Sequence, residues 1–366
     1  MRVLKFGGTS VGSVANINQV ISIVSKAAEN QKIAVVVSAL GGITDLLMQC
    51  GIEASKKDEY ASIFEEIERK HLDFITTLVK DDAEALAEIQ NLLNDLKSLL
   101  QGIFLINELS PKTVDKLLAF GEILSSTIIV RAMYAQGLDA TRKDSRDLIT
   151  TNDKYTKAGV NYKVTNSQLE YYFAKATQKI TVLPGFIASC ASGETTTLGR
   201  GGSDFTAAIV GAALNVEQVE IYTDVSGMYT ANPKLVKQAK PIDTISYHEA
   251  MELSHFGAKV LYPPTIVPVM SKNIPIRIKS TLHPEEPGTL IQNQVGINDN
   301  PIRGLSNINN VALLTLEGGG MVGIPGISKR LFETLSNQGI NIILITQASS
   351  EHSICLGVME EDAGKA

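Results

Sequence analysis

The sequence is poor in the residues that build metal sites and disulfide frameworks. Its 366 residues include three cysteines, Cys50, Cys190 and Cys355, which lie far apart and show no CxxC spacing, and five scattered histidines. Zinc sites need closely spaced ligands, and small disulfide frameworks need several paired cysteines. We therefore expect no metal-ligand set in the protein, and reduced thiols of the kind found in the cytoplasm.

Basic charge and long apolar runs are also scarce. The formal net charge is -6, whereas binding to a nucleic-acid backbone favours a net basic face. No uninterrupted apolar run reaches membrane-spanning length, and MRVLKFGG is too short for the apolar part of a signal peptide. We expect no nucleic-acid partner, no membrane partner and a cytoplasmic location. A small anionic substrate stays open, because local lysines can oppose the global sign.

Short apolar runs predict the strands of a parallel sheet. Four of them read as buried strands, at 1–6, 32–39, 179–186 and 218–225. Residues 16–29 between the first two show helical spacing, so the two strands should pair in parallel through a right-handed crossover. We expect an α/β fold, with an open, mainly parallel sheet and helices on both faces. Ligands in such sheets bind at the carboxyl ends of the strands.

A long helical region and a change in composition define the expected domains. Residues 58–137 read as helical almost throughout, and most of their apolar residues serve packing. The stretch 283–304 is rich in proline, glycine and asparagine, which indicates a boundary near residue 300. We expect one domain at 1–300 and a second domain at 301–366.

The C-terminal segment contains GGGMVG at 318–323, which formally matches the dinucleotide-binding pattern GxGxxG. However, INIILIT at 340–346 is followed closely by SICLGVM at 353–359. A gap of that length closes an antiparallel hairpin, whereas a dinucleotide fold needs a helical crossover there. The order βαββ instead favours a partial ferredoxin-like module.

The opening KFGGTS places a lysine at a strand end, directly before two glycines and two hydroxyls. Glycines let backbone N–H groups approach an anion closely, and ammonium supplies charge, so this stretch is suited to phosphate. It differs from the Walker pattern, because its lysine precedes the glycines. An ordinary glycine turn after a strand is the alternative.

Three further constellations follow strand ends: VSALGGITD at 37–45, LGRGGSD at 198–204, and the pair YTDVSGMYTANPK at 222–234 and FGAKVLYP at 256–263. A simple turn needs one or two glycines and no particular cation, so several such loops together favour a ligand site. For each glycine taken singly, a plain turn stays possible. Ser203 is placed to cap the small-residue helix that follows the second loop.

Together, KFGGTSV, VSALGGITD, LLAFGEILSS, LGRGGSD, TDVSGMYT and MELSHFGAKVLYP resemble aspartate kinase, of the amino acid kinase superfamily. The resemblance covers about residues 1–295, in the order of the family. The tail resembles the family's ACT regulatory domains. MRVLKFGGTS with ITQASSEHSI is similar to the bifunctional aspartate kinase–homoserine dehydrogenase branch, so the chain could be the kinase part of a longer polypeptide.

The resemblance implies ATP and Mg²⁺ as cofactors and L-aspartate as substrate. ATP phosphates would be held by Lys5, Gly7, Gly8, Thr9 and Ser10, and the nucleotide by Thr223, Asp224, Tyr229, Lys234 and Lys259. Aspartate would be held by Ser38, Thr44, Glu122, Arg200, Gly201 and Gly202. Catalysis would involve Lys5, Asp204 and Lys259, with Asp204 orienting the lysine and organising the metal-bound phosphates.

Two positions depart from the family pattern. Asn232-Pro233-Lys234 replaces the usual Asp-Pro-Arg, and Tyr262 replaces a histidine. Lysine keeps the charge but loses the bidentate fork of arginine, which weakens the contact assigned to Lys234.

The chemistry agrees with a carboxylate acceptor. A side-chain carboxylate with a pKa of about 4 is already ionised at neutral pH, so no general base is needed, and the sequence offers no Ser–His or Cys–His pair. Repulsion between anions is the main barrier, which cations and amide dipoles reduce. Glu122 lies in an otherwise apolar helix, where a charge needs a partner. The α-ammonium of a bound amino acid would supply it, and an internal salt bridge is the alternative.

Two other functions compete with this hypothesis: another amino-acid or carboxylate kinase of the superfamily, and a non-catalytic amino-acid sensor. The family also implies an amino-acid effector for the full-length chain, with threonine favoured over lysine, and a homodimer or higher homo-oligomer. The effector site would use residues 319–326 with Asn341 and Ile342.

Overall fold

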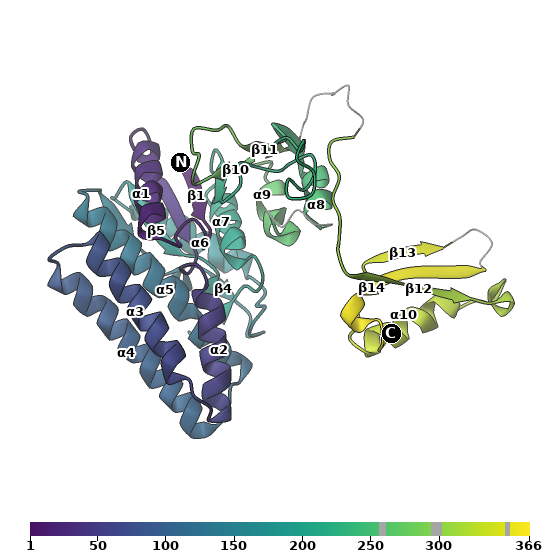
Figure 1. Cartoon of the computed structure of the whole chain (residues 1–366). Coiled ribbons are helices and arrows are strands. Elements are labelled where there is room, and N and C mark those ends of the chain that lie inside the picture. Colours follow the sequence, from purple (N-terminus) through teal and green to yellow (C-terminus); the bar gives the residue numbers. More distant parts are fainter. Residues whose placement is uncertain (256–260, 294–301, 348–351) are drawn as a thin grey trace. The chain divides into compact units, whose positions relative to one another are not determined.

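The structure is a computed structural model that describes residues 1–255, 261–293, 302–347 and 352–366. The chain divides into two compact units, Met1–Ser306 and Asn307–Ala366. Each unit has its own sheet and its own core, and they are described separately below (Figure 1).

An eight-stranded sheet forms the centre of the large unit, in the order β3-β5-β2-β1-β8-β10-β11-β9. Its pairs are parallel except for β10 with β11. The four predicted strands are confirmed as β1, β2, β5 and β8. The strands of this sheet are β1 Arg2–Phe6, β2 Ile33–Val37, β3 Ala140–Arg142, β5 Ile180–Pro184, β8 Val219–Thr223, β9 Thr244–Ser246, β10 Ile276–Ser280 and β11 Thr289–Gln292.

Helices cover both faces of this sheet, as the sequence predicts. Successive residues of β2 alternate between two hydrophobic clusters: Val35 and Val37 belong to one, Ala34 and Val36 to the other. Strands buried on both faces read as continuous apolar runs, which explains why β2 was recognisable. The first cluster contains residues of α1 Val14–Ala28, α2 Ile43–Lys56, α3 Ala61–Leu78, α4 Ala83–Ile106 and α5 Pro111–Ala135. The second contains residues of α6 Tyr162–Lys175, α7 Gly202–Ala213, α8 Tyr247–His255 and α9 Val267–Met270.

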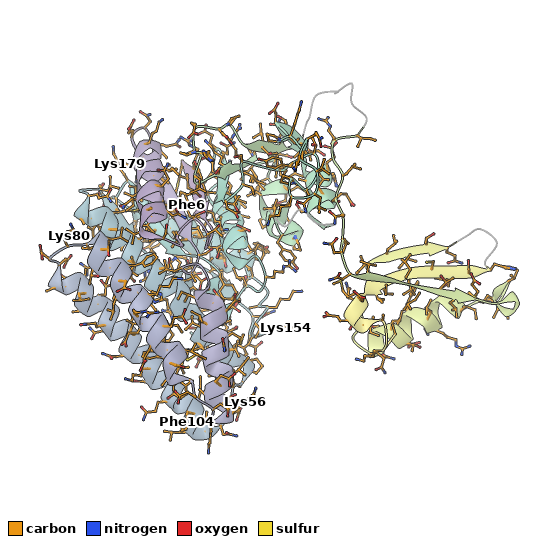
Figure 2. All side chains as sticks on the ribbon, viewed as in Figure 1. Phe6, Lys56, Lys80, Phe104, Lys154 and Lys179 are labelled. Atoms are coloured by element: carbon orange, nitrogen blue, oxygen red, sulfur yellow. The ribbon has the colours of Figure 1, made fainter. Side chains whose placement is uncertain are left out.

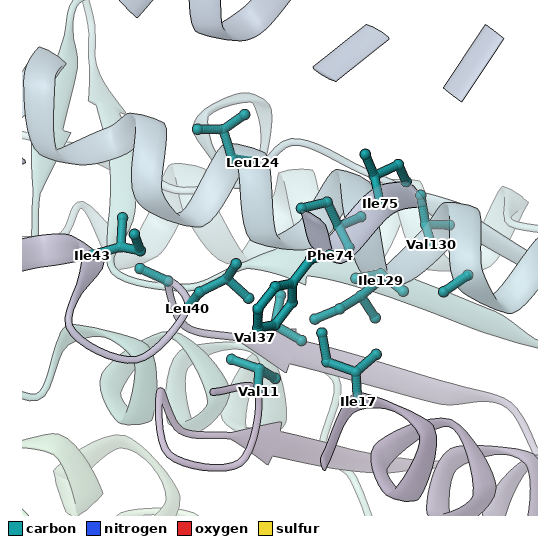
Figure 3. Packing of buried hydrophobic residues seen from close by; sticks show 14 of the residues in the cluster. Val11, Ile17, Val37, Leu40, Ile43, Phe74, Ile75, Leu124, Ile129 and Val130 are labelled. Atoms are coloured by element: carbon teal, nitrogen blue, oxygen red, sulfur yellow. The ribbon is translucent and has the colours of Figure 1, made fainter. Parts of the chain in front are cut away.

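Figure 3 shows part of the first cluster, where Val37 and Leu40 meet Phe74 of α3 and Ile129 of α5. Loop residue Leu40 therefore anchors the segment after β2 in the core. At the surface, long charged side chains point outward, for example Lys56, Lys80, Lys154 and Lys179 in Figure 2.

The predicted helical region 58–137 is confirmed as α3, α4 and α5. Asp82 and Ser110 cap α4 and α5 by accepting backbone N–H groups, and Pro111 occupies the first turn of α5, where no N–H partner is lost. By length and composition alone α5 could cross a membrane, but 83% of its apolar window is buried inside the protein. It is the central helix of the first cluster.

A small second sheet in the large unit has the order β4-β6-β7. Its strands are β4 Thr150–Thr151, β6 Ile187–Cys190 and β7 Thr195–Thr197, and short 3₁₀ segments at Ser145–Asp147 and Pro263–Ile266 complete the unit. Because β7 ends just before α7 begins, this sheet fixes the loop at 198–201.

The small unit has the predicted βαββ order. It contains β12 Val311–Glu317, α10 Ile327–Asn337, β13 Leu344–Gln347 and β14 Ser353–Met359, with 3₁₀ turns at Gly319–Met321 and Glu360–Asp362. The sheet order is β12-β14-β13, and both pairs are antiparallel, so the predicted hairpin is confirmed. The predicted strand at 340–346 begins only at Leu344, because Ile340 packs into the small core beside α10.

Candidate active site

A pocket of about 540 Å³ opens at the carboxyl ends of β1 and β2. It is lined by the loops after these strands, the start of α2, one face of α5 and the loop that leads into α7. All the residues predicted to contact aspartate line it: Ser38, Thr44, Glu122, Arg200, Gly201 and Gly202. Lys5, Gly8 and Asp204 line it too, so four segments distant in sequence meet there.

Lys5 and Asp204 form an ion pair at the floor of the pocket. Lys5 Nζ lies 2.6 Å from Asp204 Oδ1, and the two side chains are 10% and 13% exposed. A Cβ atom at Gly7 would lie 3.3 Å from the same Nζ, so the missing side chain keeps space at the ammonium. Asp204 therefore fixes a lysine charge at the start of the glycine loop 5–10, which we call the phosphate-type loop.

Glu122 is the buried carboxyl group of the pocket. It lies on α5, is 3% exposed, and accepts a hydrogen bond from the backbone N–H of Ala39. Its Oε2 has no hydrogen-bond partner among the described residues. Burial raises the pKa of this carboxyl to about 8. No ion pair to Glu122 is found in the described part of the chain, so the internal salt bridge that the sequence left open is not supported there.

The glycines of the two loops serve close approach as well as turning. A Cβ at Gly41 would lie 3.1 Å from the carbonyl oxygen of Gly8, and one at Gly8 would lie 3.3 Å from that of Ala39. The loop after β1 and the loop after β2 therefore touch backbone to backbone. Side chains larger than hydrogen would push them apart.

Two helices begin at the pocket without a side-chain cap. Gly42 and Gly201 are the N-cap residues of α2 and α7, with φ values of 81° and 70°. The prediction that Ser203 caps α7 is wrong, because the helix starts earlier and Ser203 lies in its first turn. The left-handed conformation at the cap favours glycine. Uncapped N–H groups and the positive end of the helix dipole suit an anion.

The residues predicted to hold ATP phosphates are only partly turned toward the pocket. Ser10 is buried, and its Oγ donates to Tyr222 O at 3.2 Å and accepts from Thr281 Oγ1 at 2.7 Å. Gly7 N–H donates to the same Tyr222 carbonyl at 3.3 Å. These contacts fasten the loop to β8, so the Ser10 hydroxyl has a structural partner. Thr9 is exposed.

The residues predicted to hold the rest of the nucleotide lie apart from the pocket lining. Thr223 ends β8 and donates to Asp224 Oδ1 at 3.0 Å. Tyr229 forms an isolated bridge with Pro241, and Lys234 is exposed. Lys259 lies outside the described residues.

The described residues fit a metal carried by a nucleotide better than one held by protein alone. They contain no group of three or more His, Cys, Asp or Glu side chains that could hold a metal ion. Mg²⁺ usually keeps waters and binds one or two carboxylates together with phosphates. Asp204, which lines the pocket and pairs with Lys5, is a carboxylate of the kind that could take part in such binding.

Comparison with known families decides the relationship. Residues 1–280 match the amino acid kinase family, and residues 314–366 match an ACT domain. The chain belongs to the amino acid kinase family.

Relatives of this amino acid kinase include aspartokinases. The chain is 37% identical over 369 residues to bifunctional aspartokinase/homoserine dehydrogenase 1 of Arabidopsis thaliana, covering 98% of this chain and 40% of that protein. It is 34% identical over 361 residues to lysine-sensitive aspartokinase 3 of Escherichia coli, covering 97% and 77%. The structure of E. coli aspartokinase III with aspartate and ADP (R-state) matches with a TM-score of 0.84 at 32% identity, covering 98% of this chain and 78% of that one.

The chain thus spans about two fifths of the length of the bifunctional relative.

One residue of this kinase pocket was missed by sequence reasoning. Asp115 is fully buried on α5, and its carboxylate accepts from Thr156 N–H, Thr197 N–H and the Thr197 hydroxyl at 2.7–3.0 Å. It ties the segment at 156 and the end of β7 to α5. Its spacing of seven residues from Glu122, on the same helix face, is the signal that could have revealed it.

Proposed function

We propose that this chain is an aspartate kinase, which transfers the γ-phosphoryl group of ATP to the side-chain carboxylate of L-aspartate. The products are 4-phospho-L-aspartate and ADP. The observation that carries this proposal is Glu122, a buried carboxyl group without a cationic partner in the described chain, in one pocket with Lys5 and the glycine loops.

The pocket suits the charge balance of the reaction. A carboxylate oxygen of aspartate forms a bond to the γ-phosphorus while the bond to the β,γ-bridging oxygen breaks, and ADP leaves with that electron pair. Nucleophile and phosphate are both anions, so fixed positive groups lower the barrier. Lys5 and the uncapped starts of α2 and α7 are groups of this kind.

Recognition of a free amino acid follows from the two sides of the pocket. Glu122 would pair with the α-ammonium, and burial makes that pair strong because water competes poorly. Arg200, at the opposite loop, would bind the α-carboxylate, while Ser38 and Thr44 would donate hydroxyl groups to the side chain. Bound Mg²⁺, which neutralises phosphate charge, would be held by ATP together with Asp204.

We further propose that the ACT domain binds an amino-acid effector. The E. coli relative is named lysine-sensitive, and we retain threonine as the favoured effector for this chain because of its resemblance to the bifunctional branch. ACT domains work in pairs, so the active form would be a homodimer or a higher homo-oligomer.

The deciding experiment measures ADP release with ATP, Mg²⁺ and each of several amino acids, with hydroxylamine present to trap acyl phosphate. L-Aspartate should give ADP and an equal amount of hydroxamate. N-acetyl-L-aspartate should react poorly, because it lacks the ammonium that Glu122 needs. Preference for a different amino acid would make this chain another kinase of the family. Aspartate binding without ADP formation would indicate an amino-acid sensor.

A further inference from the structure

A lysine outside the predicted motifs reaches the pocket loop from a neighbouring helix. Lys70 lies on α3, and its Nζ donates to the carbonyl oxygen of Gly41 at 2.5 Å. On the same helix Ile67, His71 and Phe74 are buried in the bundle. Lys70 lies beside these buried residues on the helix, and its own side chain is half-buried. Among the described residues, its ammonium has one hydrogen-bond partner, a backbone oxygen of the pocket wall.

The loop that Lys70 holds touches both sides of the site. Gly41 packs against Gly8 of the loop after β1, and a Cβ on either residue would crowd the other loop. Ala39 of the same loop donates its N–H to Glu122. Residues 38–42 thus connect the phosphate-type loop with the carboxyl group that faces the pocket.

The Gly41 carbonyl belongs to the peptide whose N–H is that of Gly42, the N-cap of α2. A hydrogen bond from a charged donor polarises a peptide and makes its N–H group a stronger donor. Gly42 has φ 81° and no atom within 4 Å of the position of a Cβ, so sterics around its side-chain position do not fix this peptide. The hydrogen bond from Lys70 is one restraint on this peptide, beside the packing of Gly41 against Gly8.

We propose that Lys70 is a positioning residue for substrate binding, which holds and polarises the Gly41–Gly42 peptide at the start of α2. This inference rests on the proposed aspartate kinase function. Lys70 is not among the residues that line the pocket, so it would act on the substrates through the loop 38–42. Its removal should weaken aspartate binding more than ATP binding, because Ser38 and Thr44 flank the restrained peptide on the aspartate side of the pocket.

The test compares Lys70→Met with Arg69→Met in the full chain. Methionine keeps the apolar stem and loses the ammonium, while Arg69 is an exposed neighbour on the same helix and controls for the loss of one charge. A charged hydrogen bond contributes about 1.5–3 kcal/mol, which is about 10- to 150-fold. Lys70→Met should raise KM for aspartate by at least about tenfold and KM for ATP by less than about threefold. Arg69→Met should change neither.

Two further variants keep the proposal testable if Lys70→Met fails to fold. Lys70→Arg keeps a charged donor and should restore most of the aspartate affinity, and Lys70→Gln keeps a neutral donor and should fall between. Calorimetric titration with aspartate gives the same order without turnover. Unchanged aspartate affinity in Lys70→Met or Lys70→Gln overturns the proposal, as does an equal rise in both KM values, which would show a purely structural role. Absence of acyl phosphate in the unmodified chain would instead refute the proposed function.

Discussion

At the scale of residues, the pocket separates a lysine charge from a buried carboxyl group. Lys5 lies at the end of β1, held by Asp204, whereas Glu122 lies on α5 without a cationic partner in the described residues. One side is therefore complementary to phosphate, and the other to an ammonium group. An amino acid kinase that binds a free amino acid needs both, because its substrates carry both charges.

The ammonium of Lys5 should be required for turnover and dispensable for folding. Lys5→Met removes it while keeping most of the side-chain volume, and loss of one preorganised charge commonly costs about 100-fold or more in rate. We expect kcat to fall by at least this factor in a chain that still folds, with a lower thermal midpoint because the carboxylate of Asp204 loses its cation. Steady-state kinetics and a thermal melt measure the two. A kcat within about threefold of the original would contradict the role assigned to Lys5.

The pH dependence of aspartate binding should follow the carboxyl group of Glu122. Its pKa is raised to about 8, so at lower pH the free enzyme carries it protonated and neutral. An ammonium ligand then has to displace the proton. KM for aspartate should fall as pH rises from about 6.5 to 8.5 and level off above the pKa. Initial rates at saturating ATP measure the profile.

Glu122→Gln is the control for this profile. It should raise KM for aspartate and make it nearly independent of pH, with little change in KM for ATP. Without substrate, the raised pKa means that this carboxyl group lowers stability as pH rises from its ordinary value toward 8, since the unfolded chain releases the proton first. A pH profile that survives in Glu122→Gln would assign the titration to another group.

At the scale of elements, the contact between the two glycine loops predicts that a substitution in one loop affects the binding of both substrates. In Gly41→Ala the new Cβ would lie 3.1 Å from Gly8 O, so the loop after β1 has to move. KM for both ATP and aspartate should rise. Gly102→Ala is the matched control, because Gly102 lies in α4 with no atom within 4 Å of its Cβ position.

Gly102→Ala should leave the kinetics unchanged and stabilise the protein by about 0.5–1 kcal/mol, since alanine favours a helix interior. Enzyme assays and denaturant titration measure the two effects. Normal kinetics in Gly41→Ala would show that the loops tolerate separation.

The sequence predicts those elements that show a clear pattern in neighbouring residues. Buried parallel strands such as β2 are visible as apolar runs, and α5 as a long apolar helix with a capping Ser110 and Pro111. The short strands β4 and β7 were not expected, because two or three residues carry no periodic signal. The predicted start of α7 was wrong, because the left-handed Gly201, and not Ser203, is the N-cap residue.

The site shows the same division. Lys5 and Glu122 were recognisable because a charge at a strand end or inside an apolar helix is locally unusual. Lys70 and Asp115 were not, because each acts through a loop far away in sequence: Lys70 on Gly41, and Asp115 on Thr156 and Thr197. Such contacts exist only after the helices and loops have packed.

At the scale of the whole molecule, the two units should unfold separately. The buried core of Asn307–Ala366 consists of Leu335, Ile340, Leu356, Val358 and a few further residues, including Ile354 and Met321. Domains of this size bury a smaller share of their surface than larger domains do and are marginally stable. The large unit has two extensive hydrophobic clusters instead.

The distribution of tyrosine allows this to be measured. All 10 tyrosines lie between residues 60 and 262, in the large unit, and there is no tryptophan. In denaturant, far-UV circular dichroism should lose a first fraction of its signal before tyrosine emission changes. Coincident transitions would show that the chain unfolds as one cooperative unit.

Regulation is the last property that depends on the whole molecule. The ACT domain has a pocket of about 310 Å³, lined by residues 321 and 323–326 of the predicted effector loop, by the start of α10, and by Gln347 and Ile354. Asn341 and Ile342, which the sequence suggested, are not among its lining residues.

By family resemblance, such a site is completed by a second ACT module. In the described residues the sheet of this unit has three strands, and β13 lies at its edge with its residues exposed. We therefore expect effector binding to depend on pairing of this exposed edge with another ACT module, with weak inhibition by threonine and weaker inhibition by lysine from the unpaired unit. An effector acts only as far as it binds one state of the kinase more tightly than another. Titration of each amino acid against ADP release measures this, with calorimetry as the binding control. Strong, saturable inhibition by either amino acid would show that this chain already forms a complete effector site.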